Sequence, residues 1–385
     1  MAAKTESKAP PVATPRPAGP DGSAIEAAER AWAQLGRGKQ GRRRQLELVR
    51  EVVADRTDLL VQAYASLGAV GYGDRLVGER VEHEPCLVFY VDRKLSERSR
   101  KLPAEQRLPK HVLAHATVAR KRRQVAIPTD VREGAGPTVF RAHSTTPTRR
   151  RKKVRVESAA GAVLGVPTLV VRLRNASDTR LPDRYLLSCL HVLGVTEKDH
   201  PGLPEAELAL PEGAPFAVST RKAGSLIDAS TGDSFDAALA RVDGGPEPLE
   251  ALRKAVPEQP TARARLRWQI PPRYVVWTAR GTLAAERLGF LEGANALVAY
   301  KTPGGELVTS HRELVESLVD TEPGDSGSPV VSEDGTKLLG MHIAGIGRRA
   351  LMIPAYDLIG RPFEFRGLSA NWKIELDRTF RRNGS

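Results

Sequence analysis

The pattern of apolar and polar positions changes twice in the first third of the chain. Residues 1–22 are rich in Pro and Ala and show no period, which predicts a disordered tail. In residues 23–66 apolar side chains recur at three- and four-residue spacing, which predicts a helical segment. In residues 67–140 short apolar runs alternate with polar turns, which predicts strands and a short helix in a small α/β domain.

Strand-like runs dominate the remainder. Residues 141–156 are basic and contain Pro and Thr, which indicates a linker. In residues 157–360 many short apolar runs are separated by Gly, Pro, Asn and Asp, which predicts an all-β domain. We expect residues 361–385 to be a C-terminal extension that packs as a helix or covers the β domain.

Composition narrows the class of protein. A chain of 385 residues with 41% hydrophobic content can form two or three domains with a sizeable core. It contains no run of about 18 apolar residues, so no membrane span is expected, and its N-terminus lacks the apolar region of a secretory signal. It has two cysteines, Cys86 and Cys189, which do not indicate a disulfide framework, and we expect a cytoplasmic location.

The net charge of +13 is concentrated in three clusters. These are Arg42–Arg44, Arg120–Arg123 and Arg149–Arg155. Such clusters can contact nucleic-acid phosphates, but basic runs are more often solvated surface or linker. Nucleic acid therefore stays a candidate partner that the sequence does not favour.

The most informative segment is GDSGSPV, from Gly324 to Val330. A serine between glycines can occupy a tight turn that exposes its hydroxyl and directs backbone N–H groups to one point. Acyl transfer needs this arrangement of a nucleophile beside an oxyanion hole. Ser326 is therefore a candidate nucleophile.

Three further segments supply possible partners for this serine. An apolar run that starts at Tyr185 ends on His191, and Asp236 opens a second apolar run. The segment Leu338–Gly345 follows Ser326 by about a dozen residues and reads as a strand. About 45 residues separate the histidine from the aspartate, and about 90 separate the aspartate from the serine.

Together these segments resemble the trypsin-like (chymotrypsin-fold) serine proteases, whose catalytic residues occur in the order His, Asp, Ser. The resemblance covers residues 157–360 and implies a mainly β fold, a chymotrypsin-like double β-barrel. It implies a catalytic triad of His191, Asp236 and Ser326, with an oxyanion hole formed by the N–H groups of Gly324 and Ser326. Ser188 matches the small hydroxyl residue three positions before the family's histidine, whereas Cys189 is bulkier than usual.

The same resemblance suggests substrate-binding residues. In trypsins an acid six positions before the nucleophile forms the floor of the primary pocket, and here that position is Asp320. This implies cleavage after Arg or Lys and makes the basic linker a candidate for self-processing. Gly345 would form the pocket wall, and Ile343 lies on the cleft strand where the family often has a serine.

The N-terminal part resembles the domain that precedes some bacterial trypsin-like proteases and those of the plant Narrow-leaf type. The similarity depends on Gly71–Gly73, Leu87–Val91 and Pro128–Val131. It implies a regulatory protein partner for this domain.

We therefore expect a serine endopeptidase that hydrolyses peptide bonds in proteins or peptides and needs no cofactor or metal. His111 and His115 have helix-type spacing but lack the neighbours of a metal site. The alternative is a catalytically silent protease-like scaffold that binds nucleic acid or a protein partner through its basic clusters.

Overall fold

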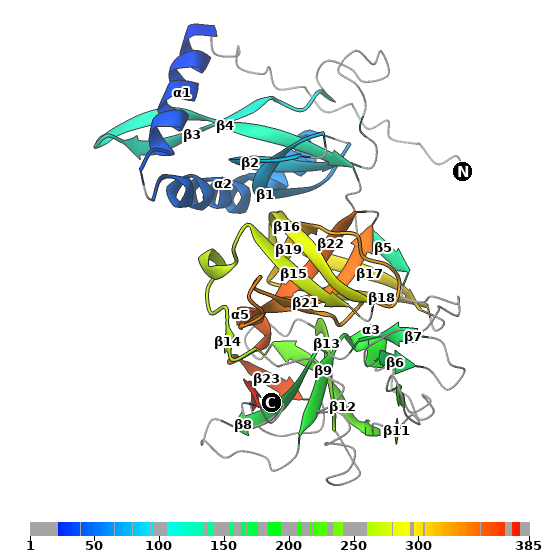
Figure 1. Cartoon of the computed structure of the whole chain (residues 1–385). Helices are drawn as coiled ribbons and strands as arrows, with labels where there is room; N and C mark the ends of the chain where they lie inside the picture. Colours follow the sequence, from blue (N-terminus) through cyan, green and yellow to red (C-terminus); the bar gives the residue numbers. More distant parts are fainter. Residues whose placement is uncertain are drawn as a thin grey trace, which may run out of the picture.

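The fold is described from a computed structural model of the chain (Figure 1). The described residues are 22–38, 40–64, 66–78, 80–91, 94, 106–133, 138–141, 155–157, 163–166, 168–175, 184–193, 207–209, 216–217, 219–228, 234–241, 260–278, 280–292, 296–302, 305–346, 348–365 and 372–377. Within this part, no helix is long and apolar enough to cross a lipid bilayer. Cys86 and Cys189 are buried free thiols. The predicted tail, except for Gly22, lies outside the described residues.

Two helices and a four-stranded sheet form the N-terminal unit. The helices are α1 (Gly22–Leu35) and α2 (Gly41–Ala63), and the strands are β1 (Leu67–Val77), β2 (Arg80–Val91), β3 (His111–Val118) and β4 (Lys121–Glu133). The apolar stripe of the helices, including Trp32 and Val49, packs with Val70 and Phe89 of the sheet. The helical segment and the α/β sheet thus share one core.

The sheet of this unit is mixed. β1 pairs antiparallel with β2, β2 pairs parallel with β4, and β3 pairs antiparallel with β4. His111 and His115 lie on β3, so the helical spacing expected for this pair is wrong. The apolar runs on either side of the β3–β4 turn form one long hairpin instead.

Six strands form a ring that we call barrel B. They are β15 (Arg273–Thr278), β16 (Gly281–Glu292), β19 (Glu313–Leu318), β20 (Pro329–Val331), β21 (Lys337–Ile346) and β22 (Arg349–Pro354). They pair in the order β15-β20-β21-β22-β19-β16, and an additional β15–β16 pairing completes the ring.

Six other strands form a closed barrel, which we call barrel A. They are β8 (Leu169–Asn175), β9 (Tyr185–Ser188), β12 (Ser219–Asp228), β13 (Ser234–Arg241), β23 (Pro362–Phe365) and β24 (Trp372–Leu376). β23 and β24 come from the expected C-terminal extension, where they form barrel strands rather than a helix. Buried side chains of both barrels, such as Leu187 and Ile343, belong to one apolar core.

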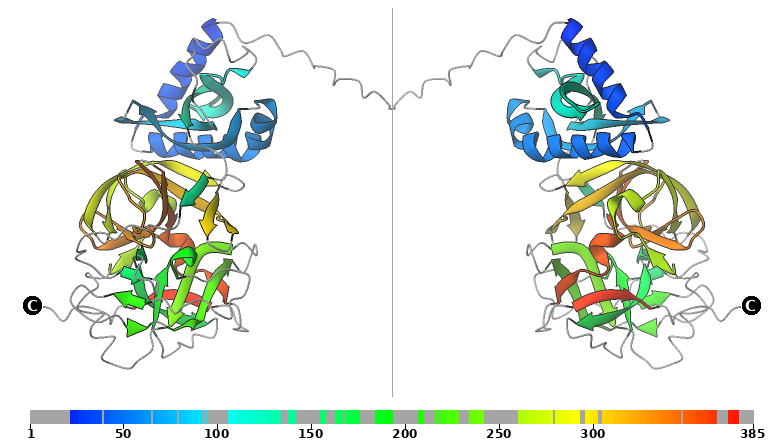
Figure 2. Two further views of the ribbon diagram at one scale, coloured as in Figure 1. Left: turned by 90° about the vertical axis from the view of Figure 1, so that its right-hand side faces the viewer. Right: turned by 90° about the vertical axis from the view of Figure 1, so that its left-hand side faces the viewer.

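Short elements connect and flank the barrels. The strands are β5 (Thr138–Arg141), β6 (Arg155–Glu157), β7 (Val163–Gly165), β10 (Glu207–Ala209), β11 (Phe216–Ala217), β14 (Ala262–Arg263), β17 (Leu297–Thr302) and β18 (Gly305–Ser310). The helical turns are α3 (Leu190–Leu193), η2 (Arg267–Gln269) and α5 (Ala355–Leu358). Figures 1 and 2 show the N-terminal unit at one end of the molecule, barrel B in the middle and barrel A at the other end.

The N-terminal sheet continues into barrel B through β1 and β16. Tyr72 pairs with Phe290, and Gly73 pairs with Gly289. A Cβ atom on Gly73 would overlap the carbonyl of Leu288, so the two strands can approach this closely only because residue 73 is glycine.

A buried arginine strengthens this junction. Arg132 of β4 is 3% exposed and forms ion pairs with Asp130 and with Glu316 of barrel B. Glu316 also accepts hydrogen bonds from Tyr90 (2.7 Å) and Arg349 (3.1 Å). Although burial alone would raise the pKa of Glu316, Arg132 and Arg349 lower it overall, so the carboxylate stays charged.

The predicted fold class is confirmed: the chain is mainly β, with a double β-barrel preceded by helices and a small α/β sheet. The boundaries proposed between domains stay predictions.

Candidate active site

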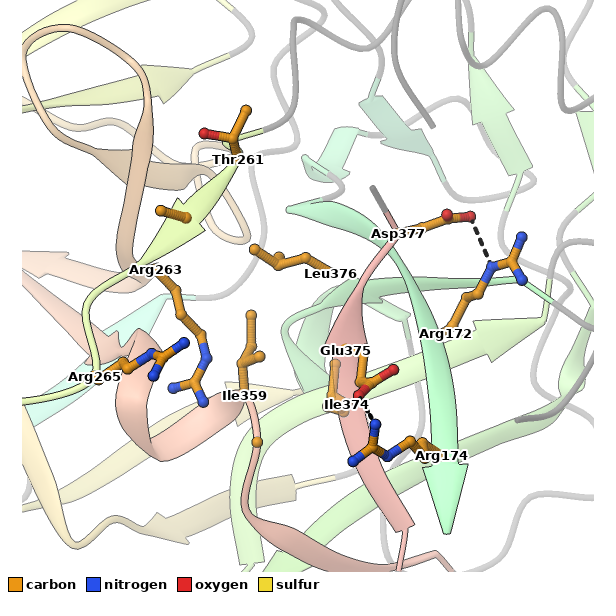
Figure 3. Close-up of a pocket in the computed structure, with 12 residues that line it drawn as sticks. Arg172, Arg174, Thr261, Arg263, Arg265, Ile359, Ile374, Glu375, Leu376 and Asp377 are labelled. Carbon is orange, nitrogen blue, oxygen red and sulfur yellow. Dashed lines mark ion pairs between the residues drawn. The ribbon is translucent and has the colours of Figure 1, made fainter. Parts of the chain in front are cut away.

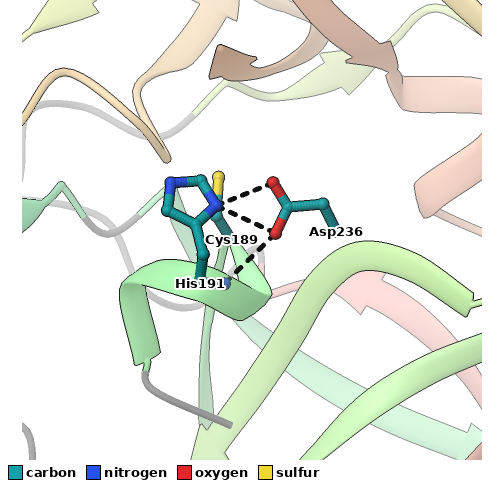
Figure 4. Close-up of side chains that lie close together, drawn as sticks. All are labelled: Cys189, His191 and Asp236. Carbon is teal, nitrogen blue, oxygen red and sulfur yellow. Dashed lines mark hydrogen bonds and ion pairs between the residues drawn. The ribbon is translucent and has the colours of Figure 1, made fainter. Parts of the chain in front are cut away.

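His191 and Asp236 form a buried pair at the edge of barrel A. His191 lies on α3, the helical turn that follows β9, and Asp236 lies on β13. The imidazole Nδ1 is 2.8 Å from one carboxylate oxygen of Asp236 and 3.0 Å from the other (Figure 4). The backbone N–H of His191 also donates to this carboxylate, at 3.2 Å. The predicted apolar run thus ends as a strand at Ser188, and a helical turn carries the histidine.

The geometry of this pair fixes the tautomer of the neutral imidazole. A carboxylate accepts hydrogen bonds, so Nδ1 must carry the proton. Nε2 is then left with a lone pair. Asp236 is 0% exposed and His191 is 5% exposed, so water screens this interaction weakly.

Cys189 lies close to this pair, and the three side chains could geometrically surround a metal ion (Figure 4). The Cys189 thiol, however, donates to the carbonyl of His342 at 3.4 Å. Burial raises the pKa of this thiol well above its ordinary value, and the charge of Asp236 raises it further. Because metals bind the thiolate, these three residues suit a histidine–carboxylate pair better than a metal centre.

The turn that carries Ser326 connects β19 to β20 of barrel B. Gly324 and Gly327 have φ values of +92° and +84°, which favour glycine. The carbonyl of Ser326 accepts the N–H of Val166 at 2.8 Å, and the N–H of Gly327 donates to the carbonyl of His342 at 2.8 Å. Main-chain hydrogen bonds therefore hold the turn on both sides.

These contacts bring the serine turn next to the histidine segment. The carbonyl of His342 accepts hydrogen bonds both from Gly327 and from Cys189, which is two residues before His191. A Cβ atom on Gly327 would overlap Ser188 Oγ, so the turn packs directly on the end of β9. Segments from the two barrels thus meet at His342.

The hydroxyl of Ser326 donates to the carbonyl of Ile343 at 3.2 Å, and within the described residues it makes no hydrogen bond with His191. The N–H groups of Gly324 and Ser326 have no hydrogen-bond acceptor in that part of the structure. Two unpaired main-chain donors beside a serine hydroxyl are able to bind an oxyanion.

Asp325, between those two donors, is fully buried and forms an ion pair with Arg280 at 2.6 Å. The same carboxylate accepts the N–H of Glu322 at 2.9 Å. Arg280 also pairs with the side chain of Glu322 at 2.8 Å and donates to the carbonyl of Asp320 at 3.2 Å. One guanidinium group therefore holds the segment that leads into the serine turn.

His342 is buried directly behind the turn. Burial lowers its pKa to about 4. The charge of Asp325 partly opposes this shift, and a positive charge on His191 would add to it. At neutral pH, His342 is therefore an uncharged neighbour of the His191–Asp236 pair.

The residues expected to bind substrate differ in their exposure to solvent. The side chain of Asp320 is exposed, whereas that of Ile343 is fully buried. Ile343 contacts Ser326 through its main-chain carbonyl. Gly345 is exposed, and a Cβ atom there would lie 2.6 Å from Thr321 Oγ1. Thr321 thus lies beside Gly345.

Sequence reasoning missed Arg280, Thr321 and the central role of the His342 backbone. Arg280 lies in the β15–β16 hairpin and belongs to no motif, so no sequence signal links it to Asp325. The sequence does contain an indication of the importance of His342, because this polar residue interrupts an otherwise apolar strand.

Comparison with known proteins adds little to this site. No family model and no curated protein matches the chain. Among solved structures, the chain is similar to the Rv3671c protease from M. tuberculosis. The inactive Ser343Ala mutant form is 15% identical, with a TM-score of 0.29, over 50% of this chain and 83% of that one. The active form is 18% identical, with a TM-score of 0.29, over 51% of this chain and 79% of that one.

Arg280→Gln should destabilise the serine turn, because it leaves the buried carboxylate of Asp325 without its counter-charge. We expect the free energy of unfolding to fall by roughly 3 kcal/mol, measured by urea denaturation. Exposed Arg273→Gln is the matched control and should change it little. Adding Asp325→Asn to Arg280→Gln should restore part of the loss. Equal stability of Arg280→Gln and wild type would show that the ion pair does not hold the turn.

His342 should make the protein less stable in mild acid. The unfolded chain protonates this histidine near pH 6.5, whereas the folded protein resists protonation until about pH 4. The unfolded state therefore binds more protons in this window, and the free energy of unfolding should fall by up to about 3 kcal/mol as the pH decreases through it. Denaturation of wild type and His342→Gln across pH 4–7 tests this, with exposed His115→Gln as the control. The same pH dependence in all three proteins would contradict the assignment.

Proposed function

We propose that this protein is a serine endopeptidase whose catalytic triad is His191, Asp236 and Ser326. The observation that carries the proposal is the buried His191–Asp236 pair, with Nδ1 2.8 Å from the carboxylate, beside a glycine-flanked serine turn. A neutral histidine held in this tautomer is suited to act as a general base. The double β-barrel and the residue order agree with the resemblance to trypsin-like proteases.

The reaction would begin when the Ser326 side chain rotates away from the carbonyl of Ile343 toward the imidazole. Nε2 of His191 takes the hydroxyl proton as Oγ attacks the peptide carbonyl. Asp236 stabilises the imidazolium that forms, and His191 then gives the proton to the leaving amine. Water completes the cycle by hydrolysing the acyl-enzyme, again with His191 as the base.

The N–H groups of Gly324 and Ser326 would stabilise the oxyanion of the tetrahedral intermediate. Each such donor contributes on the order of 3 kcal/mol to transition-state stabilisation. Arg280 supports this function indirectly, because its ion pair with Asp325 fixes the residue between the two donors. Main-chain contacts to Val166 and His342 fix the other side of the turn.

For specificity, we infer that Asp320 favours substrates with Arg or Lys before the cleaved bond. Its exposed carboxylate lies next to Thr321 in sequence, and Thr321 packs beside Gly345. The basic linker, of which residues 149–154 lie outside the described part, is then a candidate for self-processing. We also infer that the N-terminal unit binds a regulatory protein partner.

The alternative is a silent scaffold that binds nucleic acid or protein through its basic clusters. Within the described residues, Arg42 pairs with Asp74 and Arg43 pairs with Glu47, which partly neutralises one of those clusters. This observation makes nucleic-acid binding the weaker candidate.

A fluorophosphonate probe tests the nucleophile directly. It should label the wild-type protein, and labelling should disappear in Ser326→Ala because the reactive hydroxyl is gone. Ser328→Ala is the matched control, since Ser328 lies two residues away and its hydroxyl is buried. In-gel fluorescence and intact mass provide the readout. Unlabelled wild-type protein would favour the scaffold, and equal labelling of Ser326→Ala would contradict Ser326 as the nucleophile.

Peptide cleavage assays test the specificity. Wild-type protein should cleave peptides after Arg or Lys, and Asp320→Asn should reduce kcat/KM for these peptides at least tenfold because the cation loses its partner. Glu322→Gln, which removes a neighbouring exposed charge, should have a smaller effect. The purified protein should also fragment within residues 149–155, whereas Ser326→Ala should not. Preference for apolar residues, unaffected by Asp320→Asn, would refute the assignment.

A further inference from the structure

A hollow lies where β14 and the segment after α5 meet β8 and β24. Its volume is about 500 Å³ (Figure 3). In Figure 1 these elements lie on the left of the molecule, and α3 with His191 lies on the right. None of its lining residues belongs to the proposed triad or oxyanion hole.

Four arginines and two acids line this hollow, and only two of the arginines are neutralised there. Arg174 pairs with Glu375 at 3.1 Å, and Arg172 pairs with Asp377 at 3.2 Å. Arg184, outside the hollow, also pairs with Asp377, at 2.7 Å. Both acidic residues of the hollow are thus already paired with arginines.

Arg263 and Arg265 have no acidic partner within the described residues. Figure 3 shows their guanidinium groups side by side. Burial lowers the pKa of Arg263, and the charge of Arg265 lowers it further, with no acid acting in the opposite direction. Two like charges are therefore held together without compensation, an arrangement that a bound anion would relieve.

The main chain at Gly360 leaves space for one of these two guanidinium groups, that of Arg263. A Cβ atom on Gly360 would overlap the guanidinium of Arg263. Gly360 has φ of +84°, a conformation that favours glycine, and its N–H donates to the carbonyl of Ile374 at 3.1 Å. Arg263 therefore rests against exposed backbone at a position that a larger residue would close.

The hollow also has an apolar part. Ile359, Ile374 and Leu376 line it together with Arg263 and Arg265. A ligand that satisfies both parts has a negatively charged group and a short aliphatic body. A bidentate carboxylate or phosphate matches the donor geometry of guanidinium groups.

We propose that this hollow is a binding site for a small organic anion. The carboxylate or phosphate group of the ligand lies between Arg263 and Arg265, and its aliphatic part contacts Ile359, Ile374 and Leu376. The site is separate from the proposed active site, so the proposal stands whether or not the protein is a protease.

Isothermal titration calorimetry of the full chain tests the proposal with hexanoate, hexyl phosphate and uncharged hexanamide. At least one of the two anions should bind, and hexanamide should bind at least tenfold more weakly because it cannot neutralise the arginines. Whichever anion binds more tightly identifies the preferred charged group. Inorganic sulfate should bind more weakly than the tighter-binding of the two anions, since it lacks the aliphatic part.

Variants locate the binding. Arg263→Gln and Arg265→Gln should each weaken binding at least tenfold, and Arg273→Gln, which removes an exposed arginine of β15, should change it less than twofold. Arg265 is exposed, so its variant should fold even if Arg263→Gln does not. No binding of either anion, equal binding of hexanamide, or unchanged binding by Arg265→Gln would overturn the proposal.

Discussion

The main-chain carbonyl of His342 is the point on which the candidate site depends. It accepts the N–H of Gly327 from the serine turn and the thiol of Cys189 from the histidine segment. A single backbone group in barrel B thus aligns segments from both barrels. Such an arrangement tolerates little change, because a shift of β21 would move both segments. Burial keeps the side chain of His342 neutral, which avoids adding a positive charge beside His191.

Arginines neutralise buried carboxylates at two places in the molecule. At the serine turn, Arg280 neutralises a buried Asp325. At the junction with the N-terminal sheet, Arg132 and Arg349 keep Glu316 charged. In both cases one planar guanidinium group binds several acceptors, including a buried carboxylate. Arg263 and Arg265 have no acidic partner within the described residues and so depart from this pattern, which is the basis for proposing a ligand there.

Much of the fold could be predicted from the sequence, because short apolar runs and turn residues are local signals. The same signals placed Ser326 on a turn and Asp236 on a strand. The proximity of His191 to Asp236 followed from resemblance, and the structure brings these two side chains together. Their catalytic roles, with that of Ser326, remain a prediction.

Other features could not be predicted, since they depend on contacts between distant segments. The close approach of Gly73 to Gly289 requires knowledge of how β1 pairs with β16. Strands β23 and β24 have ordinary strand sequences, but only the closed barrel shows that they belong to it. Arg280 is one of many arginines until Asp325 is placed beside it.

The central claim is that Asp236 holds His191 with its proton on Nδ1, so that Nε2 carries the lone pair of a base. NMR spectroscopy of protein with ¹⁵N-labelled histidine measures this tautomer directly. We predict, at neutral pH, a strongly deshielded proton on Nδ1 of His191 that disappears in Asp236→Asn. A neutral imidazole protonated on Nε2 would contradict the account, because that ring could not accept the proton of Ser326.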